Sequence, residues 1–312
     1  MGIQDVSSDS ATGKGLHRFA VLTACCTWLL IIAGALVTGN EAGLAVPDWP
    51  LSYGSLMPPM VGGIIYEHGH RMIATTVGLL TVMLVAWLWR KEPRPSVRLL
   101  GLFALGAVIA QGILGGMTVL FFLPTGISVA HGCLAQAFFC MAVSLAWVTS
   151  AQWKSGGPIM EDPDRCPLRR LGILTMASVY GQLILGAYLR HSKSGILLHV
   201  AGALIVSLLA IWVFVRVTGR YPNVSGLHGP AVLLISLLSL QLFLGIGSYW
   251  IRAITRDAVQ PERLAVVITT AHVAVGALVL AVCLILTLQA SRLLTVPVKA
   301  PGYTPTPQNV TS

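Results

Sequence analysis

The stretch "IATTVGLLTVMLVAWLW", residues 73–89, contains no charged residue and is apolar enough to lie in lipid. Together with the residues before it, the run has the length that a helix needs to cross about 30 Å of hydrocarbon. The chain contains eight such runs, which predict spans at 17–38, 66–89, 98–121, 127–149, 170–190, 195–216, 230–251 and 264–289.

These spans must be helical, because a backbone exposed to lipid has to satisfy its own hydrogen bonds. The alternating pattern of an outer-membrane barrel is absent from this 55% hydrophobic chain, and a soluble enzyme is excluded. The sequence therefore predicts an all-α polytopic membrane protein of eight transmembrane helices, arranged as two pseudo-symmetric four-helix bundles. We place a polar tail at 1–16, the bundles at 17–150 and 170–290, a linker at 151–169 and a disordered tail at 291–312.

The positive charges indicate how these spans are oriented. Of the 20 Lys and Arg residues, fourteen fall on one side of the eight-span arrangement, at 14–18, 90–98, 154–170, 216–220 and 292–299. Five fall on the other side, and Arg71 lies at the mouth of the second span. Because cytoplasmic loops carry the excess of Lys and Arg, both termini are expected in the cytoplasm. The net charge of +9 thus reflects topology, and we expect no nucleic-acid partner.

A short motif recurs in the third, fifth and seventh spans, as "QGILG" (111–115), "QLILG" (182–186) and "QLFLG" (241–245). After an outward loop, each copy is followed by a histidine early in the next span, namely His131, His199 and His272. The first pair of spans fits more loosely, with "LLIIAGALVTG" (29–39) and then His70. The repeating unit is therefore a helical hairpin, used four times.

All four histidines are expected at one depth, roughly 8–12 Å below the outer surface, given a rise of 1.5 Å per residue. Ionisable groups inside membranes are costly, and four at a matched depth indicate a function. Zinc or copper would normally recruit carboxylate or thiolate partners, which the spans offer sparingly, whereas haem iron needs axial imidazoles and an apolar slot. The two histidines of each half would together hold one haem. The repeat glycines either let a macrocycle approach or allow close helix packing. The repeat glutamines are expected to form hydrogen bonds between helices.

The segment "YEHGHRM" (66–72) gathers four ionisable groups at the mouth of the second span. Glu67 and His70 are three residues apart and therefore share one helix face. A carboxylate beside an axial ligand, in a low-dielectric mouth, is suited to proton transfer. Arg71 would either neutralise a haem propionate or hold Glu67 ionised. His68 points about 100° away from Glu67, and we interpret it as an interfacial residue.

The outward loop "TGNEAGLAVPDWPLSYGSLMPP" (38–59), the E-x-x-H-R pattern of residues 67–71 and the later histidines resemble the haem A synthase family over roughly 17–290. The resemblance implies an enzyme that oxidises the C8 methyl group of haem O to the formyl group of haem A for terminal oxidases. It implies substrate haem O bound in the first half, haem b as cofactor in the second, and a bacterial inner membrane. The implied residues are Glu67 as catalytic acid, His70, His131 and Arg71 at the substrate haem, and His199 and His272 on the haem b iron.

The chain also departs from the family's pattern. Many bacterial members carry cysteines that flank the loop motif, where this chain has Val46 and Ser52. A redox disulfide in this loop therefore cannot belong to its mechanism, and an unidentified electron donor is required. Haem O synthase is a further partner that the resemblance suggests. No arginine follows His199, so Arg252 or Arg256 is the expected partner of a propionate.

Two other functions remain open at this point. A di-haem, quinol-linked cytochrome b subunit would need the four histidines but has no use for Glu67 or the "PDWPL" loop. A haem carrier or oxidase-assembly factor would bind haem without any chemistry.

The charge asymmetry generates a prediction about topology. A reporter fused after Ser312 should read as cytoplasmic, and one inserted in the loop 39–66 should read as external. A periplasmic reading at Ser312 would overturn the orientation.

Overall fold

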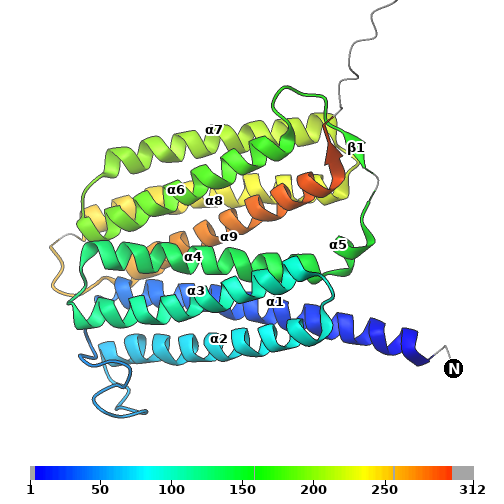
Figure 1. Cartoon of the computed structure of the whole chain (residues 1–312). Helices are drawn as coiled ribbons and strands as arrows, with labels where there is room; N and C mark the ends of the chain where they lie inside the picture. Colours follow the sequence, from blue (N-terminus) through cyan, green and yellow to red (C-terminus); the bar gives the residue numbers. More distant parts are fainter. Residues whose placement is uncertain (1–3, 158, 256, 297–312) are drawn as a thin grey trace, which may run out of the picture.

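The computed structural model describes residues 4–157, 159–255 and 257–296 and is built almost entirely of helices (Figure 1). Within these residues, eight helices are long and apolar enough to cross a membrane, and each coincides with one of the spans that the sequence predicts. Their 25 to 36 residues exceed what the hydrocarbon core requires, so their ends extend beyond it. The all-α polytopic architecture is confirmed.

Four long helices precede the linker and four follow it. The first group comprises α1 (Gln4–Gly39), α2 (Gly63–Lys91), α3 (Pro95–Leu120) and α4 (Thr125–Thr149). The second comprises α6 (Leu168–Ser192), α7 (Ile196–Arg220), α8 (Ser225–Ile254) and α9 (Arg263–Leu293). Three short elements lie outside the spans, namely α5 (Ala151–Ser155), β1 (Met160–Glu161) and β2 (Leu294–Thr295).

The two chain ends are more structured than the sequence suggests. Helix α1 begins at Gln4, ahead of the expected start at residue 17. Leu16 is buried, and Gly15 faces the ring of Trp87 on α2, so helix packing continues past the apolar run. At the other end, α9 reaches Leu293, and β2 pairs in parallel with β1. Residues 291–296 of the expected tail thus belong to α9, to β2 or to the residue after it, and its part at 297–312 lies outside the described residues.

Each half has its own core, and the halves meet along a third cluster. One core joins residues 16–146 of the first four spans, and the other joins residues 168–293 of the last four. Between them, Ile31 and Phe139 pack against Ala277 and Ala281 of α9. Trp28 Nε1 also donates to the carbonyl of Ala274, 3.0 Å away. The two-bundle division agrees with these cores, while its pseudo-symmetry and boundaries stay predictions.

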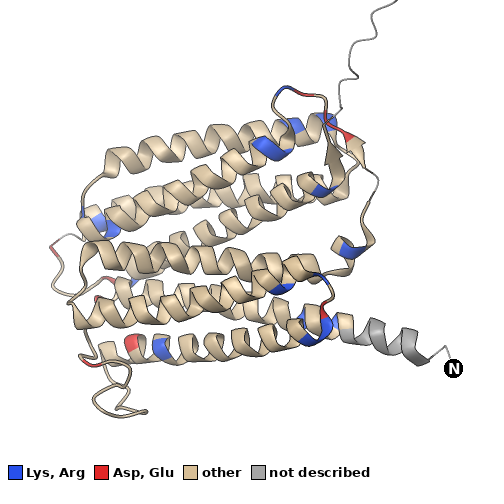
Figure 2. Ribbon diagram, viewed as in Figure 1, with Lys and Arg blue, Asp and Glu red and all other residues tan. Residues whose placement is uncertain are grey.

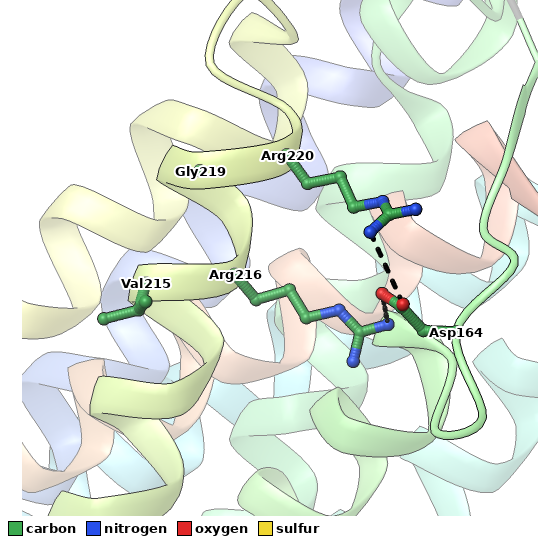
Figure 3. Close-up of a pocket in the computed structure, with 5 residues that line it drawn as sticks. All are labelled: Asp164, Val215, Arg216, Gly219 and Arg220. Atoms are coloured by element: carbon green, nitrogen blue, oxygen red, sulfur yellow. Dashed lines mark ion pairs between the residues drawn. The ribbon is translucent and has the colours of Figure 1, made fainter.

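Charged residues gather at the two ends of the helices, and the long central parts of the helices carry almost none (Figure 2). At one end, the linker is tied to α7 by ion pairs around a shallow hollow (Figure 3). Arg216 pairs with Asp162 at 3.1 Å and also with Asp164, which Arg220 contacts at 3.5 Å. Two carboxylates neutralise two guanidinium groups here. We therefore interpret these ion pairs as structural contacts that fix the linker to α7.

Candidate functional site

Each of the four histidines singled out by the repeat packs against a glycine of the preceding long helix. A Cβ atom built on each glycine would lie 3.1 to 3.2 Å from the imidazole Cε1, which is tighter than an ordinary van der Waals contact. The four pairs are Gly34 with His70, Gly115 with His131, Gly186 with His199, and Gly245 with His272. One helix therefore provides the space that the ring on the next helix fills.

This contact decides between the two roles considered for the repeat glycines. Their open side is occupied by the imidazole itself, so they serve close packing of a helix against a ring. It also completes the repeat in the first hairpin, where Gly34 lies within "LLIIAGALVTG". Sequence comparison of the repeats fits this hairpin only loosely, because Leu30 stands where the other copies have glutamine.

The three repeat glutamines connect helices, as expected. Each of them contacts the repeat histidine of the next long helix. Gln182 Nε2 lies 3.1 Å from His199 Nδ1 and donates to the His199 carbonyl at 2.8 Å. Gln111 donates to the His131 carbonyl at 3.0 Å, and its Nε2 lies 3.4 Å from a ring nitrogen. Gln241 lies 3.4 Å from His272 Nε2. Contacts of this kind fix how an imidazole is oriented toward a ligand.

The geometry of the second half suits a metal between two imidazoles. The rings of His199 and His272 are 6.4 Å apart, centre to centre, and inclined at 65°. A metal atom bound by one nitrogen of each ring at about 2.0–2.1 Å would separate the ring centres by roughly 6–7 Å. His272 Nδ1 is also buried and has no hydrogen-bond partner among the described residues, which fits a nitrogen that binds a metal.

The first half offers a second pair. Nδ1 of His70 and Nδ1 of His131 are both buried and have no hydrogen-bond partner among the described residues. No group of three or more His, Cys, Asp or Glu side chains within the described residues is arranged to hold a free metal ion. Two pairs of imidazoles in apolar surroundings therefore fit haem iron better than zinc or copper.

Glu67 is held by two strong hydrogen bonds at the outer end of α2. Its Oε1 accepts from Arg71 Nη2 at 2.6 Å, and its Oε2 accepts from the backbone N–H of Val46 at 2.8 Å. The side chain is 4% exposed. Arg71 in turn donates to the carbonyls of Asp48 and Leu51, 2.7 Å away in each case. Of its two expected roles, the structure shows Arg71 paired with Glu67.

The outward loop, residues 40–62, folds over this carboxylate. Asp48 accepts from the backbone N–H groups of Gly54 and Tyr53, which lowers the pKa of its carboxyl group below the ordinary value. Trp49 covers Gly116 of α3, where a Cβ atom would come within 2.7 Å of the indole ring. The loop is therefore a compact cap on the first four spans.

The two positions that lack cysteine belong to the same network. Val46 is fully buried and supplies the N–H that binds Glu67, while the hydroxyl of Ser52 lies 2.8 Å from His68 Nδ1. His68 is only 5% exposed, so our interpretation of it as an interfacial residue is wrong. Helical periodicity places His68 away from Glu67 correctly, but it cannot show that a loop returns to cover that face.

Neither expected propionate partner gains support. Arg252 is exposed, and Arg256 lies outside the described residues. The geometry brings Glu67 together with Arg71 next to one pair of histidines, whereas the part of the chain that the structure describes shows no buried carboxylate beside the other pair.

Comparison with known proteins places this arrangement in context. A family model described as cytochrome oxidase assembly protein matches residues 61–199. The chain is 31% identical to the haem A synthase of Shouchella clausii over 241 residues, which cover 74% of this chain and 76% of the relative. It is 29% identical to that of Halalkalibacterium halodurans over 192 residues, which cover 58% of this chain and 61% of the relative. It is 31% identical to that of Methylobacterium sp. over 159 residues, which cover 46% of this chain and 43% of the relative.

The contact between glycine and imidazole generates a prediction with a control on the same helix. In Gly186→Ala, the new methyl group meets His199 at 3.1 Å, so the ring must shift by a few tenths of an ångström. In Gly181→Ala, the methyl group meets nothing within 4 Å, and both changes favour the helix by about 1 kcal/mol. We expect haem affinity to fall about tenfold in Gly186→Ala only, as measured by the ratio of haem to protein. Equal haem retention in both variants would contradict this role for Gly186.

Proposed function

Because the chain belongs to the haem A synthase family, we propose that it oxidises the C8 methyl group of haem O to the formyl group of haem A. The observation that carries this proposal is the difference between the two halves. Both pairs of histidines suit a haem, yet only the first has a buried carboxylate and a loop that caps it. A di-haem electron-transfer protein would have no use for that difference.

We assign haem b to His199 and His272, and the substrate haem O to His70 and His131. The 6.4 Å separation of the second pair supports the first assignment, and the unpartnered nitrogens of the first pair support the second. When bound, haem b would supply one-electron redox chemistry. The glycine contacts and the glutamines would hold the imidazoles in the orientation that ligation requires.

Glu67 is the residue that we assign to proton handling. Arg71 at 2.6 Å and a backbone N–H at 2.8 Å hold its carboxyl group in a fixed orientation. In this arrangement Glu67 is ready to accept a proton or to stabilise positive charge that develops at the neighbouring haem. Arg71 holds Glu67 and the loop together, and the loop excludes water from the carboxylate.

Electrons must reach the site without a disulfide in the loop, since Val46 and Ser52 occupy the cysteine positions. We therefore propose a separate electron donor, with haem O synthase as the supplier of substrate and terminal oxidases as the destination of haem A. The protein would act in a bacterial inner membrane with both termini in the cytoplasm.

Extraction and identification of the haem from purified protein test the function. Haem B together with haem O, its hydroxylated form or haem A is the expected result. Haem B alone would favour electron transfer and overturn the proposal.

The assignment of the cofactor pair predicts the effect of removing a ligand. Replacing His199 or His272 by the non-ligating residues Ala or Leu should remove or loosen haem b, while the chain still inserts, because insertion depends on the apolar length of the helices. Absorption spectra of the purified variants give the measurement. Unchanged low-spin spectra in both variants would rule the assignment out.

The assignment of Glu67 predicts a loss of turnover. Glu67→Gln retains the shape of the side chain but removes its ionisation, so the yield of haem A per mole of bound haem b should fall by about 10²–10⁴-fold. The amide also has one oxygen acceptor where the carboxylate has two, and it cannot keep both the Arg71 and the Val46 bonds. Part of any loss of turnover would therefore come from the loop, which loses one of its hydrogen bonds to residue 67.

Ser52→Ala separates these contributions. It removes the hydrogen bond to His68 and loosens the loop, while the Val46 and Arg71 bonds to Glu67 remain. We expect this variant to keep most of its turnover. Near-normal turnover in a well-assembled Glu67→Gln protein, or an equal loss in Ser52→Ala, would leave Glu67 with a structural role only.

A further inference from the structure

Arg190 carries a charge that no carboxylate of the described residues neutralises by an ion pair. It lies two residues before the end of α6, at the same end of the bundle as the outward loop. Its Nη2 donates to the carbonyl of Ala35 at 3.3 Å, and its Nε is buried without a hydrogen-bond partner. A partly buried guanidinium with no counter-ion among the described residues is costly in a membrane protein, so its presence calls for an anionic ligand.

The position of this guanidinium is set by α1 and α9. A Cβ atom on Gly39 would lie 3.6 Å from Arg190 Nη2 and 3.0 Å from Val266 Cγ1, so Arg190 and Val266 meet over this glycine. Val266 precedes His272 by six residues on α9, which corresponds to about 9 Å along the helix. Arg190 therefore lies on the outer side of the His199–His272 pair.

We propose that Arg190 binds a carboxylate of the haem held between His199 and His272. This inference rests on the proposed function and adds a ligand-binding residue to it. Haem b is a flat apolar ring whose two carboxylates lie along one edge. With its iron fixed between the imidazoles, the carboxylate edge that faces the outer surface meets the guanidinium. The free Nε–H and a neighbouring Nη–H form the planar fork that binds a carboxylate by two hydrogen bonds.

Arg252, the candidate that the sequence suggests, provides a matched control. It carries the same charge and lies near Arg190 at the end of α8, but it is exposed to solvent. An exposed charge is screened and contributes little to holding a ligand. Loss of charge at Arg252 should therefore have a much smaller effect than the same loss at Arg190.

The test compares haem b with its dimethyl ester, in which both carboxylates are neutral. Full-length protein is depleted of haem, reconstituted with each form, and followed as the haem transfers to an apo-globin acceptor. We expect wild-type protein to release the ester about tenfold faster or more, which is the size of one charge-assisted hydrogen bond. In Arg190→Gln, the ratio of the release rate of the ester to that of the free acid should approach one. In Arg252→Gln, this ratio should match that of the wild type.

Further variants and a second measurement make the result decisive. Arg190→Lys should restore part of the preference for the free acid, and it replaces Arg190→Gln if that variant does not fold. The midpoint potential of haem b should fall in Arg190→Gln, because a buried cation favours the reduced, less positive iron. An unchanged ratio and an unchanged potential in Arg190→Gln, or an unchanged ratio in Arg190→Lys, would overturn the assignment. Failure of wild-type protein to form a low-spin haem at all would instead reject the cofactor site itself.

Discussion

The geometry of this protein depends on close contact between an imidazole on one helix and a glycine on its neighbour. The loops that connect the partners differ greatly, since Gly186 and His199 are 13 positions apart while Gly34 and His70 are 36 apart. Nevertheless, the distance from the glycine to the ring is nearly the same in all four hairpins. The spacing of the helices is thus set by the contact rather than by the connection. The ring therefore has no room to move toward the glycine.

A second constraint acts only on the first half. There, Glu67 and Arg71 bind the backbone of a loop that is 20 residues away in sequence, so the loop and the carboxylate position each other. At the two positions where the family resemblance leads one to expect cysteines, this chain uses the N–H of a buried valine and the hydroxyl of a buried serine. The cap over the first half is therefore held by hydrogen bonds, which do not depend on the redox state of the compartment.

Most of the fold could be predicted from the sequence, because eight apolar runs and the asymmetry of the positive charges are strong, local signals. The histidines were found for the same reason, since a repeated ionisable residue stands out in an apolar helix. The roles of Gly34, His68 and Arg190 could not be predicted in this way. Each depends on which segment returns to cover a helix face, and helical periodicity describes only the helix itself. Gly34 is the one for which a signal existed, because it stands at the position of the repeat glycines even though Leu30 replaces the glutamine.

The contact between glycine and imidazole also has an evolutionary consequence. Both partners belong to one hairpin, so a duplicated gene segment transmits a complete, already matched pair. Afterwards, neither partner can change alone without losing the fit, whereas residues beside the contact are free to diverge. The first hairpin shows how far such divergence can extend, with Leu30 in place of glutamine and a carboxylate at the mouth of its second helix. An ancestral pair of equivalent haem sites could thus acquire different tasks while the architecture that holds the haem was inherited unchanged.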